Sequence, residues 1–376
     1  MYTVLDSYQR FDQKNNMMMR PNWDPLLKHI GPTTFETKLR HLERNVNGFS
    51  LKEYALAASS GILGSSMGAD INQPNRAFTS WEKLTLNPYL RLPETKPELI
   101  EPEIMTGYIK RAARYFGADL VGIAKLDMRW VYSNHYISET GESKPVDIDP
   151  GYRYVIVMAK EMDYDLVRSA PSALHQAVVS LTYSKMAFLV GAVAQFIRTL
   201  GYRAIPALND TGLSVPMAID AGLGELSRQG LLITPQFGPR QRLCKVITDL
   251  PLKPDKPIEF GVAQFCSVCK KCAQACPSQA IYSGEPTAEV TSVSNNAGVV
   301  KWPLAAEKCR EYFSKIGTNC GVCLRVCPYN KKDNPLHQTA RWMTEHAPWI
   351  DPLFVKLDDV FGYGKQYNPR FFWNGN

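Results

Sequence analysis

The hydrophobic pattern of the chain becomes regular from about residue 101. In EPEIMTGYIKRAARYFGAD (101–119), apolar side chains recur every four residues, at Ile104, Tyr108, Ala112 and Phe116. Residues four apart lie on the same face of a helix. The segment therefore predicts an amphipathic helix with these residues on its apolar face.

Short apolar runs that are rich in β-branched residues follow this helix and predict buried strands. The runs are LVGIAKL (120–126), YVIVMA (154–159), RAIPAL (203–208), LLITPQF (231–237) and RLCKVITDL (242–250). We expect a long helix between Ser172 and Leu200, which Gly191 interrupts without breaking, and another helix at about 215–228. Strands and helices that alternate in this way favour an α/β or α+β sheet core.

The chain divides into four parts. Residues 1–100 are rich in Pro, Asn and Met, and we expect them to be mostly irregular, with short helices near 34–66. The regular core spans 101–257, a cysteine-rich module spans 258–335, and a helical, aromatic tail that packs on the core spans 336–376. A chain of 376 residues exceeds the usual size of one compact core, which agrees with a main domain plus an appendage.

One apolar segment near the N-terminus has the look of a signal peptide. FSLKEYALAASSGILGSSMGAD (49–70) is rich in small and apolar residues, but it starts about fifty residues into the chain and carries Lys52 and Glu53. Neither a basic stretch nor a twin arginine precedes it, and its apolar part is too short to span a bilayer. We expect a buried helix here, and no export signal or membrane span in the chain.

The overall charge does not point to a nucleic-acid partner. The chain has 43 Lys and Arg against 36 Asp and Glu, a formal net charge of +7, with 45% hydrophobic and 21% charged residues. These charges are scattered, and no run of five or six basic residues occurs. A solvated surface is therefore a better interpretation than a basic binding patch.

The cysteines are concentrated in one region. Eight of the nine fall between Cys266 and Cys327, and the first 243 residues contain none. This distribution indicates a localised metal site, since a disulfide framework is typical of small secreted domains. Cys244 stands apart in a predicted strand, where it is expected to be a small buried hydrophobic residue.

The eight clustered cysteines form two runs. The first is Cys266-x2-Cys269-x2-Cys272-x3-Cys276-Pro, and the second is Cys309-x10-Cys320-x2-Cys323-x3-Cys327-Pro. The first run matches the bacterial ferredoxin pattern, in which three cysteines bind one [4Fe–4S] cluster and the fourth binds the other cluster.

Applied to both runs, this rule predicts two ligand sets. They are Cys266, Cys269, Cys272 and Cys327 for one cluster, and Cys276, Cys309, Cys320 and Cys323 for the other. A single Cys₄ zinc site is the alternative, but it leaves four cysteines and both Cys-Pro pairs unexplained.

A two-cluster module moves single electrons, so the preceding core is expected to hold the redox centre that receives them. The usual cofactor motifs do not identify this centre. No GxGxxG follows a strand, no GxxxxGK[ST] occurs, and a D-x-H-x-x-G cobalamin motif is absent. The second cofactor therefore does not follow from residue spacing.

Three segments, taken in order, resemble the corrinoid-dependent reductive dehalogenases. They are SLTYSKMA (180–187), the stretch ALNDTG…ITDLPL (207–252) and the cysteine module. The similarity runs from about Ile104 to Lys365 and includes DMRWVYS and DDVFGYGK, and NVNGFSLKEYALAASS resembles the N-terminal segment of the family. Epoxyqueuosine reductase, which acts on tRNA, is a relative of this family.

The resemblance implies a fold and an activity. The fold is α+β, with a nitroreductase-like cobalamin-binding core followed by a ferredoxin-like module with two [4Fe–4S] clusters. In the implied reaction, typical of anaerobic organohalide respiration, electrons pass through the clusters to a base-off cobalamin. Its Co(I) then removes halide from a chlorinated alkene, alkane or aromatic compound.

The resemblance also assigns catalytic residues. Tyr183 matches the proton donor of the family, and Arg242 matches a basic partner that stabilises the phenolate, which a weakly acidic phenol needs. Arg240 lies two residues away and is left open as the alternative. Asn209 matches a residue that orients the substrate or Tyr183. Without the resemblance, the three would be interpreted as a buried tyrosine, a surface ion-pair arginine and a turn residue.

Cofactor contacts are expected from four further residues. Thr211 and Ser214 lie in the same loop as Asn209 and are expected to bind the corrin amides. Gly222 and Gly224 are expected to allow backbone to approach a flat cofactor closely.

Partners and location follow from the resemblance alone. It implies an organohalide substrate, a small membrane-anchor subunit and a low-potential electron donor, with no nucleic acid, and it leaves a homodimer open. It also implies twin-arginine export to the outer face of the cytoplasmic membrane. Since the chain shows no such signal, a cytoplasmic location stays open. The competing hypotheses are an epoxyqueuosine-reductase-like enzyme acting on tRNA and a non-catalytic electron carrier.

Overall fold

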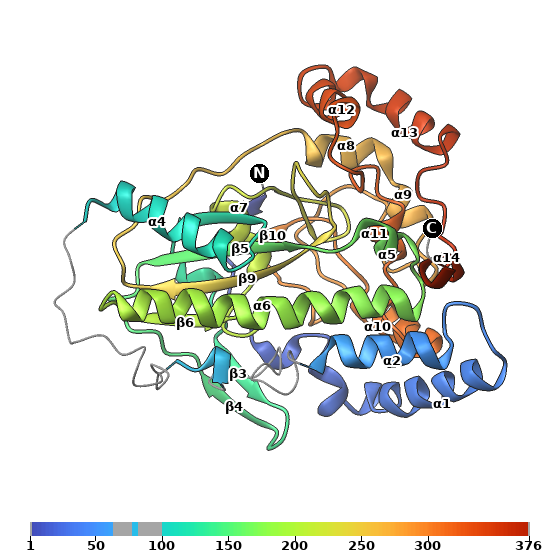
Figure 1. The fold of residues 1–376 in the computed structure, drawn as a ribbon, viewed down its shortest axis with the longest axis horizontal. Helices are drawn as coiled ribbons and strands as arrows, with labels where there is room; N and C mark the ends of the chain where they lie inside the picture. The colour runs from blue at the N-terminus through green and yellow to red at the C-terminus, as the bar shows by residue number, and fades with distance from the viewer. Residues whose placement is uncertain (1, 63–76, 82–99, 375–376) are drawn as a thin grey trace.

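The centre of the molecule is a four-stranded sheet, seen in the computed structural model, which describes residues 2–62, 77–81 and 100–374 (Figure 1). The strand order is β2 (Leu120–Lys125), β5 (Tyr154–Glu161), β9 (Gln241–Thr248) and β6 (Ala204–Ala207). Every neighbouring pair is antiparallel. The fold is therefore α+β, as expected. These strands do not form the parallel sheet of a doubly wound α/β protein.

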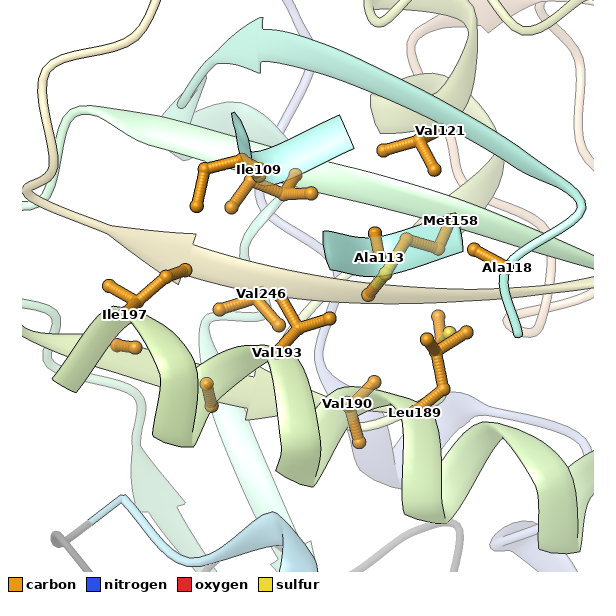
Figure 2. Packing of buried hydrophobic residues seen from close by; sticks show 14 of the residues in the cluster. Ile109, Ala113, Ala118, Val121, Met158, Leu189, Val190, Val193, Ile197 and Val246 are labelled. Atoms are coloured by element: carbon orange, nitrogen blue, oxygen red, sulfur yellow. The ribbon is translucent and has the colours of Figure 1, made fainter. Parts of the chain in front are cut away.

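One face of the sheet is covered by two helices. α6 (Ala173–Thr199) runs along the sheet, and α4 (Pro102–Tyr115) packs near β2 (Figure 1). Side chains alternate between the two faces of a strand, so Ile156 and Met158 of β5 and Val246 of β9 point to this side. Figure 2 shows Met158 and Val246 packed with residues of both helices.

The opposite face is covered by shorter elements. α7 (Ser214–Asp220) packs there together with Trp130 of the short helix η6 (Met128–Trp130) and with side chains from the N-terminal segment. Val157 of β5 and Ile247 of β9 point to this side, as the strand period requires. The sheet is thus buried on both faces.

The predicted face of α4 is wrong by one position. Ile104 and Tyr108 are 50% and 46% exposed, whereas Met105, Ile109 and Ala113 are at most 2% exposed. Both sets recur every four residues, so periodicity alone did not decide between them. The face that packs on the sheet is the one with Met105, Ile109 and Ala113. Thr106 lies beside this face, and its hydroxyl donates to the Lys253 carbonyl and accepts from the Lys253 N–H.

Two predicted elements near residue 230 are shorter than expected. The helix placed at about 215–228 ends at Asp220, and the strand placed at 231–237 is reduced to β8 (Leu232–Ile233), which pairs with β7 (Glu225–Leu226). Pro235 cannot donate to a strand ladder, and the chain turns between Thr234 and Gly238. The other four predicted strands are confirmed within two residues of their predicted ends.

α6 is the one helix of the described chain that is long and apolar enough to cross a membrane. However, 67% of its most apolar window is buried inside the protein. Since its apolar side chains pack on the sheet, α6 is a core helix, and it confirms the long helix predicted between Ser172 and Leu200.

The N-terminal region is more ordered than predicted. It contains β1 (Thr3–Val4), α1 (Ile30–Glu43) and α2 (Leu51–Ser60). α2 begins with a capping box formed by Ser50 and Glu53. The expected buried helix is only partly right, because within α2 just Glu53 and Ala57 are buried. Residues 63–70 of that prediction lie outside the described residues.

The cysteine module and the tail complete the fold. The module contains α8 (Val262–Cys269), α9 (Lys271–Gln274), β10 (Val299–Val300), α10 (Ala306–Ile316) and α11 (Val322–Arg325). The tail contains α12 (Pro335–His346), α13 (Asp351–Val360) and α14 (Arg370–Asn374). β10 pairs with β1, so the N-terminus of the chain joins the module.

The remaining elements are short. They are β3 (Asn134–Ile137), β4 (Glu142–Pro145), α5 (Tyr164–Arg168), η1 (Gln13–Asn15), η2 (Arg20–Asn22), η3 (Pro25–Leu27), η4 (Ala77–Thr79) and η7 (Pro348–Ile350).

Candidate functional site

Three predicted residues from three different elements meet at one point. Tyr183 lies on α6, Asn209 follows β6, and Arg242 lies on β9. The Asn209 amide Nδ2 donates to the Tyr183 hydroxyl at 2.8 Å, and the Arg242 guanidinium carbon lies 5.5 Å from the centre of the Tyr183 ring. All three side chains are half-buried, so they are held by packing but are not sealed from the surface.

The strand period explains why Arg242 reaches Tyr183. Arg242, Cys244 and Val246 alternate with residues that face α7, so they point toward α6. The Nε–H of Arg242 is buried and has no hydrogen-bond partner among the described residues. This N–H is therefore available to an anion formed beside Tyr183.

Arg240 lies elsewhere, which decides between the two arginines geometrically. It precedes β9 in a turn, where the strand alternation does not apply. Its guanidinium donates to the backbone carbonyls of Met162 and Lys331 and pairs with Glu161. Arg240 is 2% exposed and joins the core to the cysteine module, so its role is structural.

Two buried charged residues, Lys245 and Asp210, both bond to the loop that carries Asn209. Lys245 is fully buried, and its Nζ donates to the Leu208 carbonyl at 2.7 Å and to the Ser214 hydroxyl at 3.2 Å. Burial lowers the pKa of Lys245 to about 8, which the Asp210 carboxylate opposes. Burial raises the pKa of Asp210, which Lys245 opposes. No local sequence pattern predicts that these two charged residues are buried around one loop, since this depends on the tertiary fold.

The same loop places the two predicted cofactor residues differently. The Thr211 hydroxyl donates to the Asp210 carboxylate at 3.0 Å, and Thr211 is 1% exposed. The Thr211 hydroxyl is thus already bonded within the loop and does not face the adjoining cavity. Ser214 lies on the wall of this cavity, next to Lys245.

This cavity has a volume of about 470 Å³, which is in the range of small-molecule sites. Its wall combines the N-terminal segment, the loop after β6, the segment after β7 and the residues that precede α10. Asn209, Trp130, Tyr132, Gln229, Lys301 and Trp302 are among the lining residues. The cavity therefore adjoins the Tyr183 site through Asn209 and the cysteine module through Trp302.

The cysteines of the two runs are buried or half-buried and lie near one another, and the ferredoxin rule remains a prediction of how they divide between two clusters. Burial raises the pKa of Cys327 well above its usual value, and the nearby Cys266, Cys272 and Cys269 raise it further. Burial likewise raises the pKa of Cys309 to about 12, and Cys320 and Cys276 add to this increase.

Under the ferredoxin rule, each run lends its last cysteine to the other set, and Cys266, Cys269, Cys272 and Cys327 do line one small cavity. Cys323 lies near Cys320, Cys309 and Cys276, and also near Cys272. The two sets are therefore adjacent. We call the position among Cys266, Cys269, Cys272 and Cys327 site A, and the position among Cys276, Cys309, Cys320 and Cys323 site B.

Hydrogen bonds to sulfur suit ligands that bind as thiolates. Burial alone would raise the pKa of Cys276, but hydrogen bonds from Ser278 and from backbone N–H groups, including that of Ala280, lower it below its usual value. Among the described residues, no group of three His, Cys, Asp or Glu side chains is arranged to hold a single metal ion.

Comparisons with known proteins agree with this geometry. Residues 265–330 match the family described as the 4Fe-4S double cluster binding domain, which lies inside the predicted module. The tetrachloroethene reductive dehalogenase of Sulfurospirillum multivorans is 36% identical over 393 residues, covering 95% of this chain and 78% of that enzyme. The chain belongs to the reductive dehalogenase family.

Other relatives extend the comparison. The tetrachloroethene reductive dehalogenase of Dehalobacter restrictus is 40% identical over 301 residues, covering 69% of this chain but only 54% of that protein. A solved reductive dehalogenase, described as suggesting a mechanism for B12-dependent dehalogenation, has a TM-score of 0.73 and 26% identity. It covers 98% of this chain, which spans 48% of that one.

The epoxyqueuosine reductase relationship is more limited. The enzyme of Lactococcus garvieae is 32% identical over 133 residues, which is 34% of this chain. The similarity to the reductive dehalogenases therefore extends over far more of the protein.

Gly222 and Gly224 do not line the cavity of this dehalogenase-family chain. A Cβ at Gly222 would overlap the Lys256 carbonyl oxygen, and a Cβ at Gly224 would overlap the Ile233 carbonyl oxygen. The close backbone approach that the sequence predicted is present, but it is made by the protein's own chain and not by a cofactor.

We expect Gly224→Ala to lower the stability of the protein by about 1–3 kcal/mol, because the backbone must shift to admit the methyl group. Gly107→Ala is the matched control. Gly107 lies in α4, and no atom lies within 4 Å of the position that a methyl group would take there, so alanine should stabilise that helix slightly. Thermal unfolding measures both. A Gly224→Ala protein of unchanged stability that loses its cofactor would restore the cofactor role.

Proposed function

We propose that the protein is a reductive dehalogenase that replaces a halogen of an organohalide with hydrogen. The reaction R–X + 2e⁻ + H⁺ → R–H + X⁻ needs single-electron carriers, a proton donor and a place for the substrate. Two cysteine sets, Tyr183 and the adjoining cavity supply these needs within one connected region. The observation that carries the proposal is the Asn209–Tyr183 hydrogen bond beside Arg242, at the edge of a cavity that reaches the double-cluster module.

The cavity wall fits a corrinoid. The side-chain oxygen of Gln229 is buried and has no partner among the described residues, so it is available to an amide-bearing ligand. Ser214 and Asn209 add further polar groups, and the Trp302 ring offers a flat apolar surface. We infer that these residues would hold a corrinoid, which the B12-dependent relative supports. When bound, a corrinoid supplies a strongly reducing metal centre that transfers electrons to a carbon–halogen bond.

The residues of the chain then have distinct roles. Tyr183 donates its hydroxyl proton to the carbon that loses halide. Asn209 fixes the direction of this hydroxyl through the 2.8 Å hydrogen bond. Arg242, close to the ring and with a free Nε–H, stabilises the phenolate that the proton leaves behind. Asp210 and Lys245 act through Asn209, because their bonds to Leu208 and Ser214 hold the loop.

We propose chlorinated ethenes as the first substrates to test. The relatives at 36% and 40% identity are named tetrachloroethene reductive dehalogenases. The aromatic wall of the cavity, with Trp130 and Tyr132, suits an apolar molecule. We also propose a low-potential protein as the electron donor and a small membrane subunit as an anchor.

The test is anaerobic purification with cofactor reconstitution, followed by an assay with tetrachloroethene and a reduced viologen dye. We expect about eight irons and one corrinoid per chain, and chloride release that depends on both. A protein that binds iron but no corrinoid, with clusters that still cycle reversibly, would instead support the electron-carrier hypothesis.

A further inference from the structure

Arg228 is a fully buried arginine between the cavity and site A. It is 1% exposed and follows β7. Its Nε and Nη2 donate to the carbonyl oxygen of Cys266 at 3.0 and 2.8 Å. Its Nη1 donates to the carbonyl oxygens of Tyr282 and Gly284, both at 2.9 Å. The guanidinium is thus fixed against the first cysteine of site A.

No carboxylate balances this charge within the part of the chain that the structure describes. All four hydrogen bonds of the Arg228 side chain end on neutral backbone carbonyls. Two other buried arginines do pair with carboxylates, Arg240 with Glu161 and Arg20 with Asp24. An unpaired buried charge is costly, so an anion is expected beside Arg228.

Arg228 and the four cysteines of site A line one small cavity, so the guanidinium lies beside the position that a cluster would take. On its other side, the guanidinium carbon lies 4.7 Å from the centre of the Trp302 ring, and Trp302 lines the cavity. Gln229, the next residue, lies on the walls of both the cavity and site A.

An iron–sulfur cluster at site A would provide the missing anion. A [4Fe–4S] cluster with four thiolate ligands carries a net negative charge, and this charge grows by one when the cluster takes up an electron. Net charge, hydrogen bonds and exposure set the reduction potential of such clusters. A fixed cation without a competing carboxylate therefore favours the reduced cluster.

We propose that Arg228 raises the reduction potential of the cluster at site A, the cluster that adjoins the cavity. This inference deepens the proposed function and rests on its two-cluster assignment. The step is the uptake of one electron from an external one-electron reductant, with no bond broken. No proton needs to accompany the electron, because Arg228 already balances part of the added charge.

The experiment is an anaerobic redox titration of the reconstituted protein with titanium(III) citrate, followed by electron paramagnetic resonance. We expect Arg228→Gln to lower the equilibrium constant for reduction of one cluster at least about tenfold, a shift of about 59 mV to more negative potential. The second cluster, at site B, is the internal control and should keep its potential. Arg228→Lys, which keeps the charge, should shift much less.

Specific results would overturn the proposal. One is an Arg228→Gln protein with eight irons and two unchanged potentials. Another is an equal shift in Arg228→Lys and Arg228→Gln, which would assign the effect to hydrogen bonding and not to charge. The titration needs neither corrinoid nor organohalide. Shifted potentials in a protein that never dehalogenates would therefore refute the proposed function and leave this inference standing.

Discussion

Tyr183→Phe is expected to lower the rate of halide release by at least about 100-fold, while iron and corrinoid contents stay unchanged. General acid catalysis by a positioned side chain contributes typically 10²–10⁴-fold. The substitution removes only the hydroxyl that Asn209 orients, because the ring itself packs in two hydrophobic clusters that phenylalanine also fills. Chloride release under saturating tetrachloroethene measures the effect.

Tyr154→Phe is the matched control for this prediction. Tyr154 is another partly buried tyrosine of the same large hydrophobic cluster, but it lies at the far end of β5 from the Tyr183 site. Loss of its hydroxyl should leave the rate unchanged. If Tyr183→Phe released chloride at the rate of the unmodified protein, another group would have to supply the proton, and the assignment of Tyr183 would be wrong.

The Tyr183 site was predictable because it is built on regular elements. α6 and β9 follow clear periods of 3.6 and 2 residues, so a residue on one can be matched to a residue on the other once the fold class is known. The resemblance supplied which residues to match. Arg240 shows where this reasoning fails. Its spacing of two residues from Arg242 suggested that both side chains lie on one face of a strand, but the strand begins only at Gln241.

The parts that escaped prediction depend on contacts between distant segments. The cavity wall combines residues near positions 2, 130, 209, 229 and 301, and no local pattern connects them. The burial of Asp210 and Lys245 has the same origin, because a lysine within a strand predicts an exposed position and not a buried one. Gly222 and Gly224 correctly predicted that another group lies close to the backbone, but the sequence does not show whether that group is a cofactor or the protein's own chain.

The cysteines lie between these two cases. Spacing alone gave the crossover rule, and the neighbours of Cys327 and Cys309 agree with it. The crossover is less obvious from the second run, because ten residues separate its first two cysteines where two separate those of the first run.

The crossover leads to a second prediction of large effect. Cys276→Ala is expected to abolish dehalogenation and to lower the iron content from about eight to about four per chain. Cys276 comes from the first run, but its neighbours include Cys309 and Cys320, so its loss should empty site B and spare site A. Cys327→Ala should do the reverse, emptying site A although it comes from the second run.

Double variants separate the crossover from a simple pairing of each run with its own cluster. Cys276→Ala with Cys309→Ala removes two ligands of site B only, so about four irons should remain. Cys276→Ala with Cys272→Ala removes one ligand from each site, although both belong to the first run, and no intact cluster should remain. Iron analysis and electron paramagnetic resonance of the reduced proteins measure both outcomes. Cys244→Ala is the control, since Cys244 is fully buried in the core away from both sets and should keep all eight irons.

The reverse pattern would contradict the assignment. If Cys276→Ala with Cys272→Ala kept four irons while Cys276→Ala with Cys309→Ala kept none, each run would bind its own cluster. Arg228 distinguishes the crossover from one cluster per run in a second way. It contacts Cys266, so it should change the reduction potential only of the cluster whose ligands include that residue. In a Cys276→Ala protein, the surviving cluster should therefore still respond to Arg228→Gln, whereas in a Cys327→Ala protein the surviving cluster should not. Site A would then be defined twice, by its ligands and by the charge beside it.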